Sequence, residues 1–101
     1  MRRGTTPTHT FELPPELNGS LIAKAMVIYS QNDKEVFNKK TEDCDIGDNY
    51  IRVTLSQEDT FKFSCKKNVE IQLRIVTHDG KASTSDVIVR NVYKCLNDEV
   101  M

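Results

Sequence analysis

An acidic stretch in the middle of the chain is the first place where the residue types could do chemistry. It holds four carboxylates and a glycine: Glu42, Asp43, Asp45, Asp48 and Gly47. Calcium prefers several oxygen ligands, and the spacing that starts at Asp43 partly matches an EF-hand loop. That loop needs a bidentate glutamate at its twelfth position, where this chain has Thr54. We therefore interpret the stretch as a solvated turn and predict no metal site there.

The cysteines and histidines are the next candidates: Cys44, Cys65, Cys95, His9 and His78. They are scattered singly, without the paired spacing of a zinc site, so we predict no bound zinc. His9 falls on an expected strand and His78 at a hairpin tip, where a polar side chain needs no catalytic role. The odd number and low density of cysteines favour free, mostly buried thiols. A bridge between Cys44 and Cys65 remains an alternative in an oxidising compartment.

Nucleophilic catalysis needs a base positioned beside the nucleophile. Cys65 is followed by Lys66 and Lys67, which would lower the pKa of its thiol. No histidine is tied to Cys65 by sequence spacing, and the chain has no GxSxG, P-loop or Rossmann fingerprint. We therefore predict that the protein is not an enzyme and has no catalytic residues and no cofactor.

The overall charge argues against nucleic acid or a membrane as a partner. The chain carries 14 basic and 15 acidic residues, for a net charge of −1, so it has no general attraction for polyanions. The only basic and aromatic cluster is Lys62, Lys66 and Lys67 near Phe61 and Phe63, and we interpret both phenylalanines as core. No apolar run approaches the roughly 20 residues of a membrane span. Two arginines open the chain without a following apolar segment, which predicts folding in the cytoplasm.

The stretch from residue 67 to residue 91 is the element around which the other residues are arranged. Its first arm alternates, with Val69, Ile71, Leu73 and Ile75 on one face and polar residues on the other. Period-two alternation is typical of a strand with one buried face. Asp79-Gly80 predicts a tight turn. A second arm follows over 82–91, and we expect 92–96 to continue it.

Other apolar runs predict further strands at 8–13, 20–30, 35–41 and 50–55. The run 20–30 is ambiguous, because Leu21, Ala25 and Ile28 would also line one face of a helix. The β-branched Val27 and Ile28 favour a strand, central because it is apolar on both faces. The run 35–41 fits an edge strand, where Lys39 and Lys40 would discourage aggregation. Ser56 predicts the N-cap of a short helical turn that plugs the core with Phe61 and Phe63.

These elements predict one all-β domain over residues 1–101. Six or seven short strands with hairpin turns and one helical turn indicate an antiparallel sandwich or small barrel. We expect an Ig-like β-sandwich, with residues 1–7 and 97–101 as frayed ends.

Several segments together carry a family resemblance: 2–9 with Phe11 and Leu13, 29–31, 53–63, and 69–74 with the late 94–100. The chain resembles small single-domain proteins from prophages of Gram-positive bacteria. It also resembles, more distantly, the N-terminal β-sandwich of phage baseplate upper proteins. The shared motifs are a strand end, a helical turn and a hairpin, so they bear on the fold more than on the function.

The resemblance implies a structural module of a phage tail or baseplate. It implies synthesis in the bacterial cytoplasm, incorporation into the virion, homo-oligomers, and contacts with other tail or baseplate proteins. The alternative is a small soluble binding protein, either a prophage regulator of a host protein or a carbohydrate-binding module. A sugar-binding face usually shows exposed aromatic residues, and this chain has no tryptophan and three tyrosines.

Overall fold

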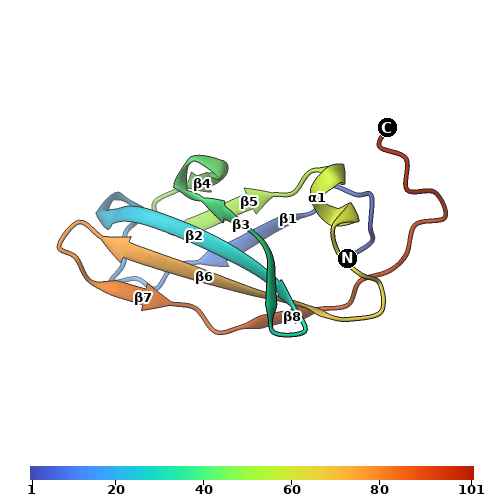
Figure 1. Ribbon diagram of the computed structural model, residues 1–101. Coiled ribbons are helices and arrows are strands. Elements are labelled where there is room, and N and C mark those ends of the chain that lie inside the picture. Colours follow the sequence, from blue (N-terminus) through green and yellow to red (C-terminus); the bar gives the residue numbers. More distant parts are fainter.

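The computed structural model describes residues 1–101 as two antiparallel sheets that face each other (Figure 1). The smaller sheet has the order β1 (Thr8–Glu12), β5 (Tyr50–Thr54) and β4 (Cys44–Ile46). The larger has the order β3 (Lys34–Lys40), β2 (Ile22–Gln31) and β6 (Val69–Thr77). The other edge of β6 is shared by β7 (Ala82–Thr84) and β8 (Ile88–Arg90). The all-β sandwich predicted from the sequence is confirmed.

The strand order is that of a variable-type immunoglobulin sandwich. The smaller sheet corresponds to strands B-E-D, and the larger sheet corresponds to C′-C-F-G, with β7 and β8 together in the place of G. Antibody domains join strands B and F by a disulfide. Here all three cysteines are free and lie outside β1 and β6. No disulfide therefore joins the two sheets.

The core lies between the sheets because the inner positions of each strand are apolar. Fifteen buried hydrophobic residues form one cluster. β6 alternates as its sequence predicts, with Val69, Ile71, Leu73 and Ile75 all 5% exposed or less. At one end, the ring of Tyr29 stacks on Phe37 with centroids 4.9 Å apart, and Phe63 lies 6.0 Å from Tyr29. This aromatic cluster closes the sandwich at the end where the helix lies.

The strand predicted over 20–30 forms from Ile22 to Gln31 as β2, which is central in its sheet as expected, while Ser20 and Leu21 belong to a short 3-10 turn before it. Its turn to β3 uses Asn32 and Asp33 at positive φ, 52° and 63°, the geometry of a tight hairpin turn. Only one face of β2 is buried, however. Met26 and Ile28 point away from the core and are partly exposed. Their apolar character reflects an outer sheet surface that no further layer of this chain covers.

The last expected strand, 82–91, is interrupted. Leu73 of β6 donates its backbone N–H to the Ser85 hydroxyl at 3.0 Å, and its carbonyl accepts from the Ser85 N–H at 2.8 Å. The Ser85 hydroxyl thus replaces a backbone carbonyl as the acceptor of the Leu73 N–H. Residues 85–87 leave the sheet between β7 and β8. Residues 92–96 do not continue the strand; Val92 is buried and Tyr93 forms an isolated bridge with Arg2.

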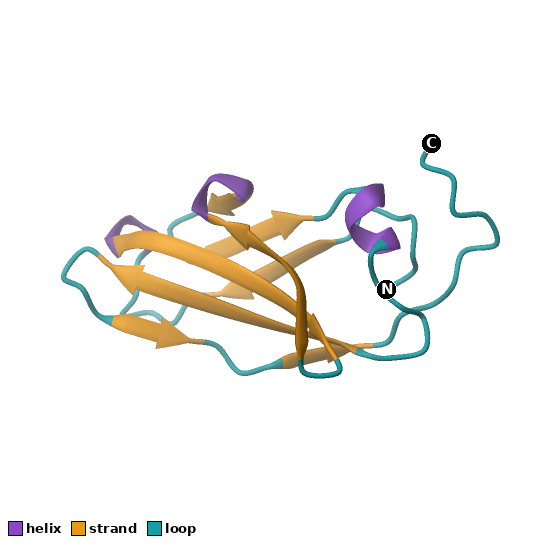
Figure 2. Cartoon of the chain, in the orientation of Figure 1, coloured by secondary structure: helices purple, strands orange, loops and turns teal.

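Helical structure is confined to three short pieces: η1 (Gly19–Leu21), η2 (Thr41–Asp43) and α1 (Gln57–Phe61) (Figure 2). Ser56 caps α1 as predicted, accepting from the Asp59 N–H at 3.1 Å. Phe63 is 1% exposed, as expected of a core plug. Phe61 is only partly buried and lies over Gly4, so its assignment to the core was wrong.

One further expectation needs correction. The acidic turn at 42–49 contains a short strand, because β4 pairs with β5 over Cys44–Ile46. The terminal segments lie outside the two sheets and make hydrogen bonds to each other and to α1. No helix of the structure is both long and apolar enough to cross a membrane.

Candidate interaction face

The outward surface of the larger sheet is the candidate functional site. The strand register places Met26 of β2 between Lys40 of β3 and Arg74 of β6. Lys24 lies opposite Val76 in the same way, and Val76 lies opposite Ala82 of β7. Because paired residues in a sheet share a face, these side chains form one continuous patch. Its centre is apolar and its rim is basic.

This surface is hollowed into an open groove of about 510 Å³. Met26, Val76 and Ala82 supply apolar lining, and η2 closes the groove on one side through Thr41 and Glu42. Thr41 is fixed there because its hydroxyl accepts from the Ala25 N–H at 2.9 Å. A volume in this range suits a small ligand or several side chains of a partner.

The charges around the groove are not balanced within the domain. Lys24, Lys40 and Arg74 all line it, and none forms an ion pair in this structure. Glu42 is the one acidic residue of the lining. The groove therefore combines an apolar floor with a surplus of positive charge, which favours a ligand that is apolar and acidic.

β3 forms a free edge of this same sheet. β3 pairs with β2 and with no other strand, so one side of its backbone has no partner in the sheet. It ends in Lys39 and Lys40, as the sequence predicted for an edge strand. Lys39 points away from solvent, however, and its ammonium group lies 2.8 Å from Asp59 Oδ2.

His9 has a structural role, because it forms a hydrogen bond to a buried tyrosine. Its Nδ1 lies 2.8 Å from the hydroxyl of Tyr29, a fully buried side chain. Burial, together with the positive charge of Arg90, holds the pKa of His9 below its ordinary value. Burial also raises the pKa of the Tyr29 hydroxyl. Both groups are therefore neutral near pH 7, and the pair bridges β1 to β2 across the core.

Removing that bridge has a measurable cost. We expect Tyr29→Phe to lower the free energy of unfolding by about 1–2 kcal/mol, because His9 loses the partner of a partly buried nitrogen. Tyr93→Phe is the matched control, since Tyr93 is 50% exposed. Urea unfolding of both variants measures the difference; equal midpoints would contradict a structural role for the pair.

The other candidates from the sequence are dispersed. Cys44 and Cys95 are partly buried and Cys65 is exposed, so the expectation of mostly buried thiols fails for Cys65. Burial, with Asp43 and Glu42 nearby, raises the pKa of the Cys44 thiol. No three histidine, cysteine, aspartate or glutamate side chains lie together in a way that could hold a metal ion.

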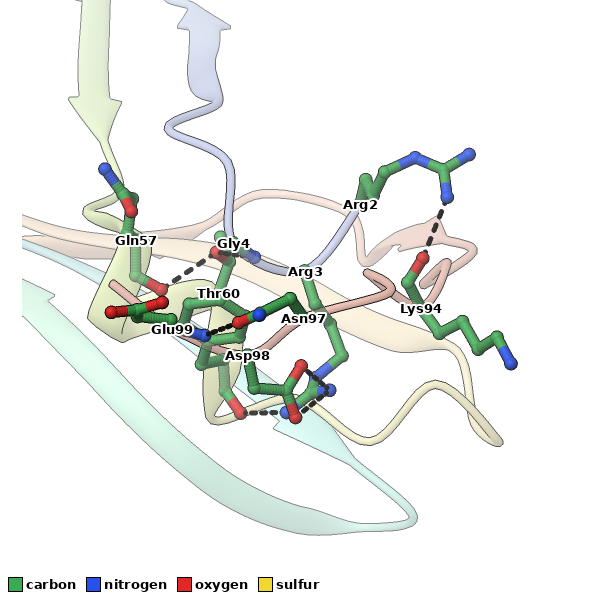
Figure 3. Close-up of polar contacts among 10 residues, drawn as sticks. Arg2, Arg3, Gly4, Gln57, Thr60, Lys94, Asn97, Asp98 and Glu99 are labelled. Carbon is green, nitrogen blue, oxygen red and sulfur yellow. Dashed lines mark hydrogen bonds and ion pairs between the residues drawn. The ribbon is translucent and has the colours of Figure 1, made fainter. Parts of the chain in front are cut away.

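A second polar cluster joins the two ends of the chain, and sequence reasoning missed it (Figure 3). Arg3 donates from Nη1 to both Asp98 oxygens, at 3.0 and 3.1 Å, and from Nη2 to the Phe61 carbonyl at 2.9 Å. The Gly4 N–H donates to the Thr60 hydroxyl at 2.9 Å. Residues 95 positions apart meet here, and no local pattern signals such a contact.

Comparisons with known proteins add little. Neither a family model nor a curated protein matches the chain. Among solved structures, the chain is similar to the V domain of amphioxus IgVJ-C2, at 9% identity and a TM-score of 0.37. The match covers 91% of this chain and 96% of that domain. Nothing about function follows from it.

Proposed function

We propose that this protein is a structural assembly module of a phage tail or baseplate, present in several copies and without catalytic activity. The assignment to a phage particle is based on the resemblance of the strand-end, helical-turn and hairpin motifs to those of prophage and baseplate proteins. In that setting the domain docks to copies of itself and to other tail proteins. It is made in the bacterial cytoplasm and becomes part of the virion.

The observation that carries the assembly role is the uncovered outer face of the larger sheet. A partly exposed apolar surface, bordered by charged residues that have no ion-pair partner, is typical of a surface that binds another protein. Here Met26, Ile28 and Val76 lie on such a face beside Lys40 and Arg74. Tail assemblies are symmetric, so one such face used repeatedly suffices to build a ring or a stack.

Light scattering across a concentration series tests the assembly role. We expect the purified chain to form a defined oligomer, and Met26→Glu to shift it to monomer. Thr10→Glu is the matched control, because Thr10 lies exposed on the opposite outer face, paired with Arg52. A wild-type monomer at every concentration, or equal disruption by both variants, would contradict the assignment of this face.

The phage setting needs its own experiment. After induction of the prophage that encodes the chain, we expect the protein in gradient-purified particles at a fixed multiple of the particle number. Quantitative mass spectrometry of the virion fraction measures that stoichiometry. Recovery of the protein solely in the soluble lysate, with particles free of it, would overturn the virion assignment.

The groove itself favours one alternative, a small soluble binding protein that regulates a host protein. That function would use the same face for a partner outside the virion. Capture of one host protein by the wild type but not by Met26→Glu, together with absence from particles, would support it.

A further inference from the structure

The C-terminal tail, residues 94–101, is exposed at every position except Cys95, which is partly buried. Leu96 is 96% exposed, Met101 99% and Val100 48%. An open space of about 340 Å³ separates the tail from α1, lined by Phe61, Asn97 and Met101 among others. Apolar side chains left in water on a loosely packed segment are a favourable target for burial against another surface.

The tail and the groove are complementary in chemistry. The tail has two adjacent carboxylates, Asp98 and Glu99, with the apolar Leu96 before them and Val100 and Met101 after them. The groove offers an apolar floor at Met26 and three cations without ion-pair partners. Opposite charge over an apolar contact favours one register of binding.

We propose that the groove of one copy binds the C-terminal tail of a second copy of this chain. This inference rests on the proposed function and names the partner of the same face. The tail leaves the domain at the α1 end, whereas β7, whose residues line the groove, lies at the opposite end of a molecule 46 Å long (Figure 1). Docking a tail on the neighbour therefore stacks the domains head to tail.

Head-to-tail contacts are heterologous, since each copy contributes a different surface. Repetition of one heterologous contact closes into a ring or extends into a filament. Both outcomes match a symmetric tail component.

The tail is held to its own domain by few side-chain contacts. They are the Arg3–Asp98 ion pair at 3.0 Å and a hydrogen bond from Arg2 to the Lys94 carbonyl at 2.8 Å, and two hydrogen bonds between Gln57 and Met101. Asp98 is 58% exposed and Arg3 19%, and solvent access to the carboxylate weakens the ion pair. Exchange of the tail between domains replaces these contacts with the groove contacts.

Complementation between two defective chains tests the inference. Arg74→Glu damages the groove and keeps the tail. The double variant Asp98→Lys and Glu99→Lys damages the tail and keeps the groove. These substitutions change exposed residues, and circular dichroism melts check that both variants fold. Each alone is expected to be monomeric by light scattering, and an equimolar mixture is expected to give a species of twice the chain mass.

The outcomes separate this inference from the proposed function. Assembly that persists unchanged in both variants overturns tail docking and leaves the module's self-assembly intact. A mixture that stays monomeric although each variant has lost assembly also overturns the tail exchange. A monomeric wild type at every concentration overturns both.

Discussion

Phe63→Ala is expected to lower the free energy of unfolding by about 3–5 kcal/mol, because it empties the site of a fully buried aromatic ring. Phe63 is 1% exposed and its ring lies 5.3 Å from Phe37 and 6.0 Å from Tyr29. These rings come from β2, β3 and the segment after α1, which cannot all move inward to refill the space. Urea unfolding followed by circular dichroism measures the loss.

Phe61→Ala is the matched control for Phe63. Phe61 is partly exposed and contacts Gly4 and Arg3 at the surface, so we expect a loss of about 1 kcal/mol. Equal losses for the two variants would mean that Phe63 does not close the core as described.

Asp59→Asn is expected to destabilise the fold by about 2–3 kcal/mol. Asp59 Oδ2 lies 2.8 Å from the Lys39 ammonium and accepts the Ser56 N–H at 2.9 Å. The Asp59 and Lys39 side chains are 9% and 21% exposed. Removing one partner leaves the other charge partly desolvated, and partial solvent access reduces the penalty below that of a fully buried pair. Asp45→Asn is the control, because its pair with Arg52 is exposed, and we expect a change within about 0.5 kcal/mol.

The same pair predicts a pH dependence. Burial alone would raise the pKa of Asp59, but the hydrogen bonds from Lys39 and Ser56 outweigh it and hold the pKa below its ordinary value of 3.8. A carboxyl with a depressed folded pKa binds fewer protons in the folded state than in the unfolded state. Its contribution to stability is therefore complete above the unfolded pKa and is lost as pH falls through the folded pKa.

The pH dependence can be measured by denaturant unfolding of the wild type and Asp59→Asn from pH 7 downward. We expect the two stabilities to converge at acid pH, since the wild type alone loses the ionised Asp59. A difference that stays constant over the whole range would contradict the ion-pair account.

Local patterns in the sequence predict the elements of this fold well. Alternation of Val69, Ile71, Leu73 and Ile75 identifies β6, and Ser56 identifies the start of α1, because both signals lie within a few residues. The break at Ser85 was not predictable in this way. It depends on the Ser85 hydroxyl, which accepts a hydrogen bond from the Leu73 N–H across the sheet. Predicting that contact requires knowledge of the strand register.

Sequence patterns could not predict the candidate site, for the same reason. Met26, Arg74 and Ala82 come together because β2, β6 and β7 pair in one register. The sequence did show that β2 is apolar on both faces. That pattern has two physical explanations, a strand buried on both sides or a strand with an uncovered apolar face, and the three-dimensional arrangement selects the second.

Methyl NMR on the three methionines can show whether the protein assembles through the outer face of the larger sheet. Met26 lines the groove, Met101 lies in the tail, and Met1 packs against the core cluster at the surface. As the concentration of the full chain rises, we expect the Met26 methyl signal to shift or broaden while the Met1 signal stays unchanged. The Met101 signal is expected to change together with Met26. A Met26 signal that is constant from low to high concentration, while the solution mass rises, would place the interface elsewhere and contradict the account.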